Sequence, residues 1–188
     1  MTKKILFLFM CVTFLSAESE QAEGPHGPGT EDWYFSFGFG PSLTNNMEDV
    51  TDDVSSAGID FAFYWHRTPK TIMGIGINGK YDSYSDIFGS MQYNLYNYSI
   101  NSINYFNSFG KGPFWRCDIG AAKANALVSS IFGSETENSD WGVGASLGGG
   151  YSIDFKGKTR LLIGLYATSL QIEGESESYI NFMINGLW

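Results

Sequence analysis

The sequence predicts an all-β chain that folds as an eight-stranded antiparallel up-and-down β-barrel spanning a membrane. Three observations lead to this prediction. Apolar and polar residues alternate with period two in one segment after another. Charged residues make up 16% of the 188 residues, where a soluble domain carries about 25%. The connections between the segments alternate in length and in the sign of their charge.

Composition excludes several other classes of protein. The aromatic content of 16% is too high for a disordered chain, and 23 glycines disfavour a helical one. A net charge of −9 argues against a nucleic-acid partner, because an acidic surface repels phosphate.

The N-terminus has the organisation of an export signal. A basic pair precedes an apolar run over residues 5–15, which is shorter than the ~20 residues that span a bilayer. We predict a signal peptide over residues 1–19, cleaved after Ser19, with cleavage after Ala17 as the second choice. A lipoprotein signal at Cys11 is disfavoured because the two residues before it are not small.

A glycine- and proline-rich stretch follows the signal peptide. Residues 20–31 are expected to form a flexible periplasmic leader, in which His26 is an ordinary linker residue. Residues 32–188 are expected to form the barrel. With Cys11 removed, Cys117 is the one cysteine left, so no intrachain disulfide is expected to support this exported domain.

Seven segments place an apolar residue at nearly every second position, which is typical of β-strands with one apolar face. In chain order they run over Trp33–Phe39, Ala57–Trp65, Met73–Ile77, Trp115–Ala121, Trp141–Ile153, Leu161–Ala167 and Ile180–Trp188.

An eighth segment, Gln92–Phe106, is predicted as a strand whose register the pattern leaves open. Its large residues fall on both faces: Tyr96, Tyr98, Ile100 and Phe106 on one, and Leu95, Ile103 and Tyr105 on the other. A β-bulge near Ser102 would explain the switch.

Residue types decide which face meets lipid. The polar face consists mostly of Gly, Ser, Asn, Ala and Thr, which suit the narrow interior of an eight-stranded barrel. The other face is rich in Phe, Trp, Ile and Leu, which suit lipid contact. All five tryptophans lie near segment ends, as in an interfacial aromatic belt.

Charges within the strands support this direction, because a charge facing lipid costs ~2–4 kcal/mol. Six of them share the polar face and are predicted to pair as an interior charge network: Asp60, Lys80, Arg116, Asp118, Asp154 and Arg160. Lys123 breaks the pattern, and we place it at a strand end, where its ammonium can reach the headgroups.

The connections separate the remaining charges. Four of them hold 12 acidic and no basic residues: 43–54, 82–90, 124–140 and 172–178. The three short turns hold five basic and no acidic residues: 67–70, 107–113 and 155–158. Long acidic loops outside and short turns in the periplasm are the outer-membrane arrangement.

The last segment ends on an aromatic carboxy-terminus, and its outward residues Ile180, Phe182, Ile184 and Trp188 resemble the signal read by the outer-membrane barrel assembly machinery. Taken together, residues 32–188 resemble the small eight-stranded OmpA/OmpX-like outer-membrane β-barrel family. The resemblance implies a Gram-negative outer-membrane location, contact with outer-membrane lipid and lipopolysaccharide, and a structural or surface-interaction role through the loops.

Other functions remain open as alternatives: a small pore, a secreted soluble barrel that binds an apolar ligand, and a lipid A-modifying enzyme. The enzyme is disfavoured because His66 lies at the periplasmic rim, a strand length from Ser55 and Ser56. The acidic run 48–53 lacks EF-hand spacing, and Gly148–Gly150 lies within a strand rather than in a phosphate-binding loop. We therefore expect no catalytic residues, no metal site and no cofactor.

Overall fold

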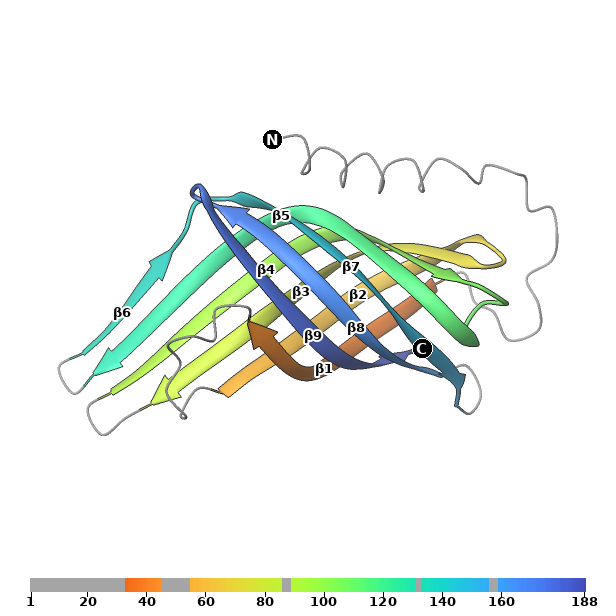
Figure 1. The fold of residues 1–188 in the computed structure, drawn as a ribbon, viewed down its shortest axis with the longest axis horizontal. Coiled ribbons are helices and arrows are strands. Elements are labelled where there is room, and N and C mark those ends of the chain that lie inside the picture. The colour runs from red at the N-terminus through yellow and green to blue at the C-terminus, as the bar shows by residue number, and fades with distance from the viewer. Residues whose placement is uncertain (1–32, 45–54, 86–88, 131–132, 156–158) are drawn as a thin grey trace.

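Eight long strands close into a barrel, and a ninth, short strand extends one wall (Figure 1). The computed structural model describes residues 33–44, 55–85, 89–130, 133–155 and 159–188, so the expected signal peptide (1–19) and leader (20–31) lie outside the described residues. The strands are β1 (Trp33–Thr44), β2 (Ser55–Thr68), β3 (Thr71–Ser85), β4 (Gly89–Tyr105), β5 (Gly112–Ser130), β6 (Gly133–Asn138), β7 (Gly142–Asp154), β8 (Arg160–Ile172) and β9 (Glu175–Leu187). The predicted fold class, an all-antiparallel eight-stranded barrel, is confirmed.

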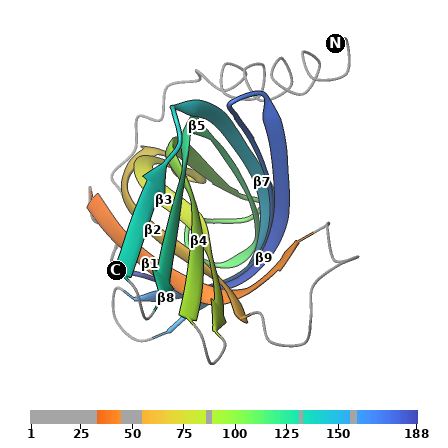
Figure 2. The same ribbon diagram turned by 90° about the vertical axis from the view of Figure 1, so that its left-hand side faces the viewer.

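The barrel closes because the first strand pairs with the last. β1 pairs with β9, β4 pairs with β5, and β5 pairs with β7, so the ring seen in Figure 2 has no gap between its eight strands. At the seam, the amide of Phe35 donates to the carbonyl oxygen of Trp188 at 2.7 Å, and the amide of Trp188 donates back at 2.9 Å. Closure pairs the backbone groups that an open sheet would leave exposed to lipid. In the part of the chain that the structure describes, no helix is long and apolar enough to cross a membrane.

The two ends of the barrel differ. We call the end that carries Trp33 and Trp188 the terminal end, and the opposite end, reached by Ser85, Ser130 and Ile172, the acidic end. The short connections β2–β3, β4–β5 and β7–β8 lie at the terminal end.

The barrel interior consists of three layers. Near the terminal end, an apolar cluster includes Tyr34, Tyr64 and Ile103. Near the acidic end, a second apolar cluster includes Leu95 and Leu170. Between them lies a polar layer of buried charged, amide and hydroxyl side chains, which include Asp60, Asn78, Asn97, Asn101, Arg116, Asp118, Ser146, Thr168, Asn181 and Asn185. The interior is therefore packed rather than open.

The predicted bulge near Ser102 is wrong. β4 pairs with β3 and with β5 in unbroken register along its length. Its odd-numbered residues point inward, so Leu95, Ile103 and Tyr105 belong to the two interior clusters. The large residues fall on both faces because this strand contributes to the interior packing as well as to the outer surface.

The expected long loops are largely strand. β3 and β4 extend to Ser85 and Gly89, and the expected loop 124–140 is the end of β5 folded back on β6. The loop expected over 172–178 is a two-residue turn at Glu173 and Gly174. Both turn residues have positive φ, 51° and 89°, which is the conformation of the tightest hairpin turns and suits glycine at the second position. The strand pattern is hidden in these segments because most residues are polar on both faces or, as at Leu127 and Val128, apolar at adjacent positions. The connection 45–54 lies outside the described residues.

At many glycines of the barrel, an added side chain would collide with the backbone of the neighbouring strand. A Cβ at Gly120 of β5 would lie 1.9 Å from the carbonyl oxygen of Tyr98 on β4, far inside a normal contact. We expect Gly120→Ala to lower the free energy of unfolding by roughly 1–3 kcal/mol, because the two backbones must separate. Urea unfolding, followed by the gel mobility of the folded form, measures the change.

The matched control for Gly120→Ala is Ala121→Leu, on the outer face of the same strand. It adds apolar surface towards lipid and should leave the unfolding midpoint unchanged or raise it. Equal destabilisation by both substitutions would contradict the close approach.

Candidate functional site

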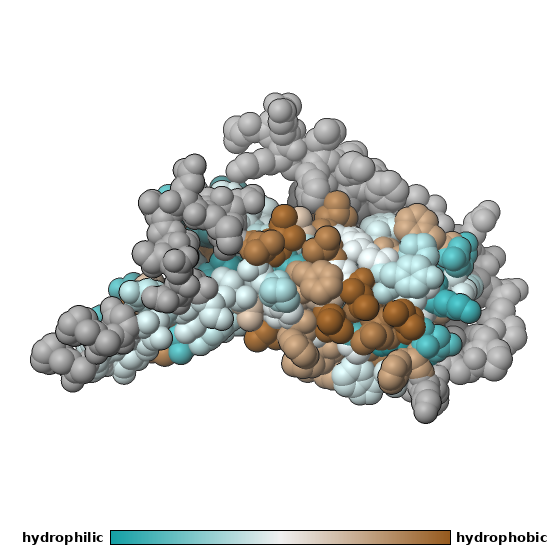
Figure 3. Space-filling view, turned by 60° about the horizontal axis from the view of Figure 1, so that its bottom comes forward, coloured by the Kyte–Doolittle hydropathy of each residue, from teal (hydrophilic) through white to brown (hydrophobic). Residues whose placement is uncertain are grey.

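An apolar band surrounds the barrel. Large apolar side chains are exposed on the outer face of every barrel strand except β5, whose Trp115 and Ile119 are half-buried. On the face shown in Figure 3 they gather over the middle of the molecule, away from the hydrophilic extension at the left. They include Phe37, Phe39, Ile59, Phe61, Phe63, Ile75, Ile77, Ile100, Val143, Leu147, Leu165, Ile180, Phe182 and Ile184. A patch of this extent is far larger than soluble proteins expose, and it matches the lipid-facing surface of a membrane barrel.

Aromatic residues border this band. At the terminal end, the rings of Trp33 and Trp65 lie 6.2 Å apart and Trp188 packs on Phe35. Towards the acidic end, the ring of Trp141 lies 5.5 Å from that of Tyr98. Amphipathic rings in these positions suit the two membrane–water interfaces.

The position expected for Lys123 is wrong in one respect. Lys123 does not end a strand, because β5 continues to Ser130. Its ammonium lies 5.3 Å from the ring centre of Trp141, in the aromatic border on the acidic side. A cation at this level stays near the interface and is stabilised by the ring.

A buried ion-pair cluster occupies the polar layer. The guanidinium of Arg116 donates two hydrogen bonds of 2.7 Å to Asp60, and its Nε donates one of 2.8 Å to Asp118. All three side chains are at most 4% exposed. The two-pronged contact with Asp60 is the strongest geometry available to this pair.

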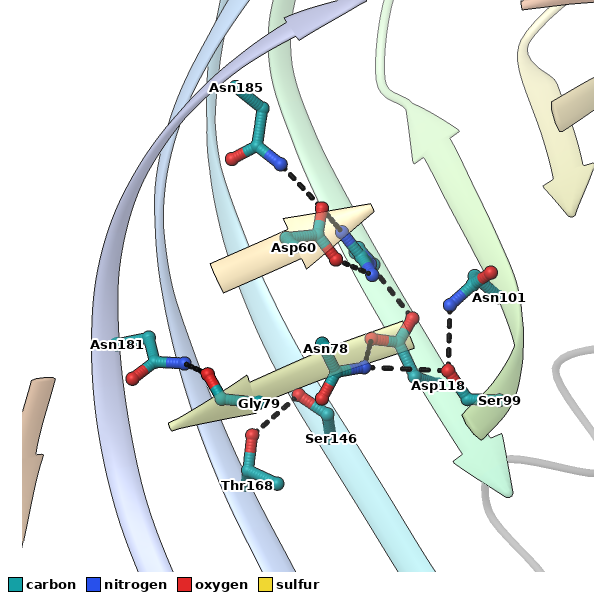
Figure 4. Close-up of polar contacts among 11 residues, drawn as sticks. Asp60, Asn78, Gly79, Ser99, Asn101, Asp118, Ser146, Thr168, Asn181 and Asn185 are labelled. Carbon is teal, nitrogen blue, oxygen red and sulfur yellow. Dashed lines mark hydrogen bonds and ion pairs between the residues drawn. The ribbon is translucent and has the colours of Figure 1, made fainter. Parts of the chain in front are cut away.

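Amide side chains complete the cluster (Figure 4). Asn185 donates to Asp60 at 2.5 Å, and Asn78 donates to Asp118 at 3.0 Å. Asn101 donates to the hydroxyl of Ser99, which also accepts from Asn78. Sequence reasoning missed these asparagines, although the alternation already places them on the inward face of β3, β4 and β9.

The six side chains expected to form one interior charge network are divided into three groups. Asp60, Arg116 and Asp118 meet in the middle. Lys80 pairs with Asp82 at 2.5 Å, and Asp82 also accepts a hydrogen bond from Ser56. Asp82 had been expected in a loop, so its inward role in the extended β3 was missed.

The third group lies at the terminal end. Arg160 lies 3.5 Å from Asp154, which is 59% exposed, so this pair belongs to the rim rather than to the interior. The Arg160 guanidinium also lies 5.6 Å from the ring centre of Phe109.

Phe109 closes the terminal end from inside. It lies in the β4–β5 turn, and its ring packs 4.4 Å from His66, 4.7 Å from Tyr34 and 5.4 Å from Tyr105. The hydroxyl of Ser152 fastens this turn by donating to the carbonyl oxygen of Gly110 at 2.8 Å. His66 is therefore part of an aromatic seal.

The acidic end holds a pocket of about 270 Å³. Its floor includes Ala124 and Ile172, and its rim carries carboxylates from β6, the β8–β9 turn and β9: Glu137, Glu173, Glu175 and Glu177. Burial, together with the negative charge of Glu177 and Asp82, raises the pKa of Tyr93, which lines the pocket. Among the described residues, no group of three or more His, Cys, Asp or Glu side chains is placed to hold a metal ion.

The expected assembly residues all lie on the outer surface. Ile180, Phe182 and Ile184 point outward from β9 into the apolar band, and Trp188 is half-exposed at the terminal end.

The fold resembles solved outer-membrane barrels. Ail, the attachment invasion locus protein of Yersinia pestis, aligns with a TM-score of 0.57 and 10% identity, over 85% of this chain and all of Ail. Neisserial surface protein A aligns with a TM-score of 0.57 and 9% identity, over 84% of this chain and 96% of that one. The N-terminal barrel domain of Pseudomonas aeruginosa OprF aligns with a TM-score of 0.52 and 11% identity, over 84% and 98%. No family model and no curated protein matches the chain.

The Arg116 cluster predicts a strong effect of single substitutions. Arg116→Met removes the cation and leaves two buried carboxylates without it, so we expect a loss of about 3–5 kcal/mol in unfolding free energy. The triple variant Asp60→Asn, Arg116→Met, Asp118→Asn removes all three charges and should recover most of that loss. Urea unfolding of both variants measures the difference. A triple variant no more stable than Arg116→Met would show that packing, rather than charge, is responsible.

Proposed function

We infer that the chain spans the outer membrane through its apolar band, since it has the fold of the small eight-stranded outer-membrane β-barrels. We propose that it is a non-catalytic member of the cell envelope that acts structurally or through contacts at its acidic end. The observation that carries this proposal is the combination of an apolar exterior with a packed interior.

The packed interior argues for a structural or surface role over a pore. An aromatic seal around Phe109 stands at the terminal end, and apolar clusters lie on both sides of the polar layer. The apolar exterior likewise argues against a secreted soluble barrel, because such a protein would present its polar face to water.

The distribution of groups that could do chemistry argues against lipid A modification. His66 is packed against Tyr34 and Phe109 at the terminal end. Ser55 and Ser56 lie at the opposite end of β2, roughly 35 Å away at strand geometry. A nucleophile and its base must lie within hydrogen-bond reach, so these residues do not form a catalytic pair.

The charge at the acidic end favours cationic extracellular partners. Ail has been crystallised in complex with sucrose octasulfate, a heparin analogue. The described carboxylates of this chain's acidic end, including Glu135, Glu137, Asp140, Glu173 and Glu175, favour the opposite sign of ligand.

We infer that lipid and lipopolysaccharide contact the band, and that the barrel assembly machinery reads β9 through Ile180, Phe182, Ile184 and Trp188.

Cell fractionation tests the membrane assignment. We expect the protein in the outer-membrane fraction, with a gel mobility that changes on heating, as a closed barrel gives. A protein recovered from the soluble periplasm without detergent would contradict the assignment.

Lysine substitutions at two depths test the position of the band. Phe61→Lys places a charge in the middle of the band and should lower the free energy of unfolding by ~2–4 kcal/mol. Phe155→Lys, at the terminal end, should lower it by at most about 1 kcal/mol.

Electrical recording tests the pore alternative. Because the interior is sealed by Phe109 and by both apolar clusters, we expect no discrete conductance steps from the purified protein in a planar bilayer. Reproducible steps that disappear when the protein is heat-denatured before reconstitution would support a pore instead.

A further inference from the structure

The ion-pair cluster in the polar layer has an unbalanced charge. Arg116 supplies one positive charge, while Asp60 and Asp118 supply two negative charges. Of the other inward cations on the described strands, Lys80 lies against Asp82, and Arg160 lies beside Asp154 at the rim. A net charge of −1 is therefore enclosed between two apolar clusters, where an uncompensated charge is costly.

A small cavity adjoins this charge. Its volume is about 10 Å³, which is the space that one water-sized particle needs. Besides Arg116 and the side chains of Ile59, Tyr166 and Met183, the cavity is lined by Asp60 and Asp118, by Asn78 and Asn181, and by the hydroxyl-bearing Ser146 and Thr168. Figure 4 shows these side chains on different strands of the barrel, with Asn78 turned towards Asp118 and Asn181 towards Gly79.

Two of the lining side chains have unused acceptors. The amide oxygens of Asn78 and Asn181 accept no hydrogen bond, although these residues are only 6% and 4% exposed. Their amide nitrogens are engaged, by Asp118 and Ser99 for Asn78 and by the carbonyl oxygen of Gly79 for Asn181. Buried acceptors without a donor are uncommon, and an ordered water or a bound ion is the usual partner.

We propose that this cavity binds one dehydrated monovalent cation, and that Na⁺ fits it best. Hard cations take carboxylate and carbonyl oxygens, which the two aspartates and the two asparagines of the lining supply. The guanidinium of Arg116, also in the lining, is held on the two carboxylates. A single positive charge brings the cluster to neutrality, whereas a divalent ion would leave it at +1. The volume excludes a hydration shell, which Mg²⁺ gives up reluctantly. The site goes beyond the envelope role proposed above and does not depend on it.

The test compares two salts of equal ionic strength. The purified chain is refolded into detergent micelles in NaCl or in choline chloride at neutral pH, and its thermal midpoint is read from the gel mobility of the folded form. Choline is too large for the cavity. We expect a higher midpoint in NaCl and a shift that saturates as the Na⁺ concentration rises.

Three variants make the test specific. Asp118→Asn neutralises the cluster and should abolish the Na⁺-dependent shift. Asn181→Ala removes one proposed ligand without changing charge, and should raise the Na⁺ concentration needed for half of the shift. If Asp118→Asn does not refold, Asn181→Ala still tests the site. Asp82→Asn, at the Lys80 pair, is the matched control and should keep the full shift.

Two outcomes would overturn the proposal. One is an equal thermal midpoint of the wild-type protein in both salts. If acidification alone then raises that midpoint, the compensating charge is a proton rather than Na⁺. The other is an unchanged Na⁺-dependent shift in both Asp118→Asn and Asn181→Ala, which would place any Na⁺ effect elsewhere.

Discussion

The packed interior and the apolar outer surface of this barrel both depend on the pairing of β1 with β9. In a bilayer an unpaired backbone group has no water to bond, so the sheet has to close on itself. Closure with eight strands leaves an interior that side chains just fill. That narrowness explains why the inward side chains of opposite walls meet and fill the interior in layers. It also directs the large apolar residues outward, where lipid is their solvent.

The layered interior follows from the same constraint. A barrel with an entirely apolar core would need no polar groups, yet this one places Asp60, Arg116 and Asp118 at its middle. The apolar clusters on either side exclude water from that layer and so strengthen each of its electrostatic contacts. They also make any imbalance of charge there costly. Because the apolar clusters exclude water, the polar layer is stable only if every charge in it has a partner.

Sequence reasoning predicted the fold class because the alternation of apolar and polar residues is a local property that can be read from one sequence. It also predicted which face of most strands meets lipid. It failed on β4, where Ile103 and Tyr105 are apolar and yet point inward, because apolar residues on both faces of a strand leave no alternation to read. It failed again beyond the membrane, where β6 is polar on both faces and adjacent apolar residues, Leu127 and Val128, break the alternation of β5. The partners within the charge network could not be predicted, since pairing depends on the relative stagger of β2, β3 and β5. Phe109 was missed because its packing depends on how a turn folds back into the barrel.

The walls at the acidic end are unequal in height. β5 runs eight residues past its last pairing with β7 at Ala122, roughly 25 Å of chain, while β8 and β9 stop in a two-residue turn near that level (Figure 1). The wall formed by β3 to β6 therefore extends further from the apolar band than the wall formed by β8 and β9. On the β8–β9 side, a molecule that lies flat on the lipid surface passes no extension of a described strand before it reaches the acidic rim. If that rim binds partners as proposed, steric access as well as charge favours partners that are already attached to a surface.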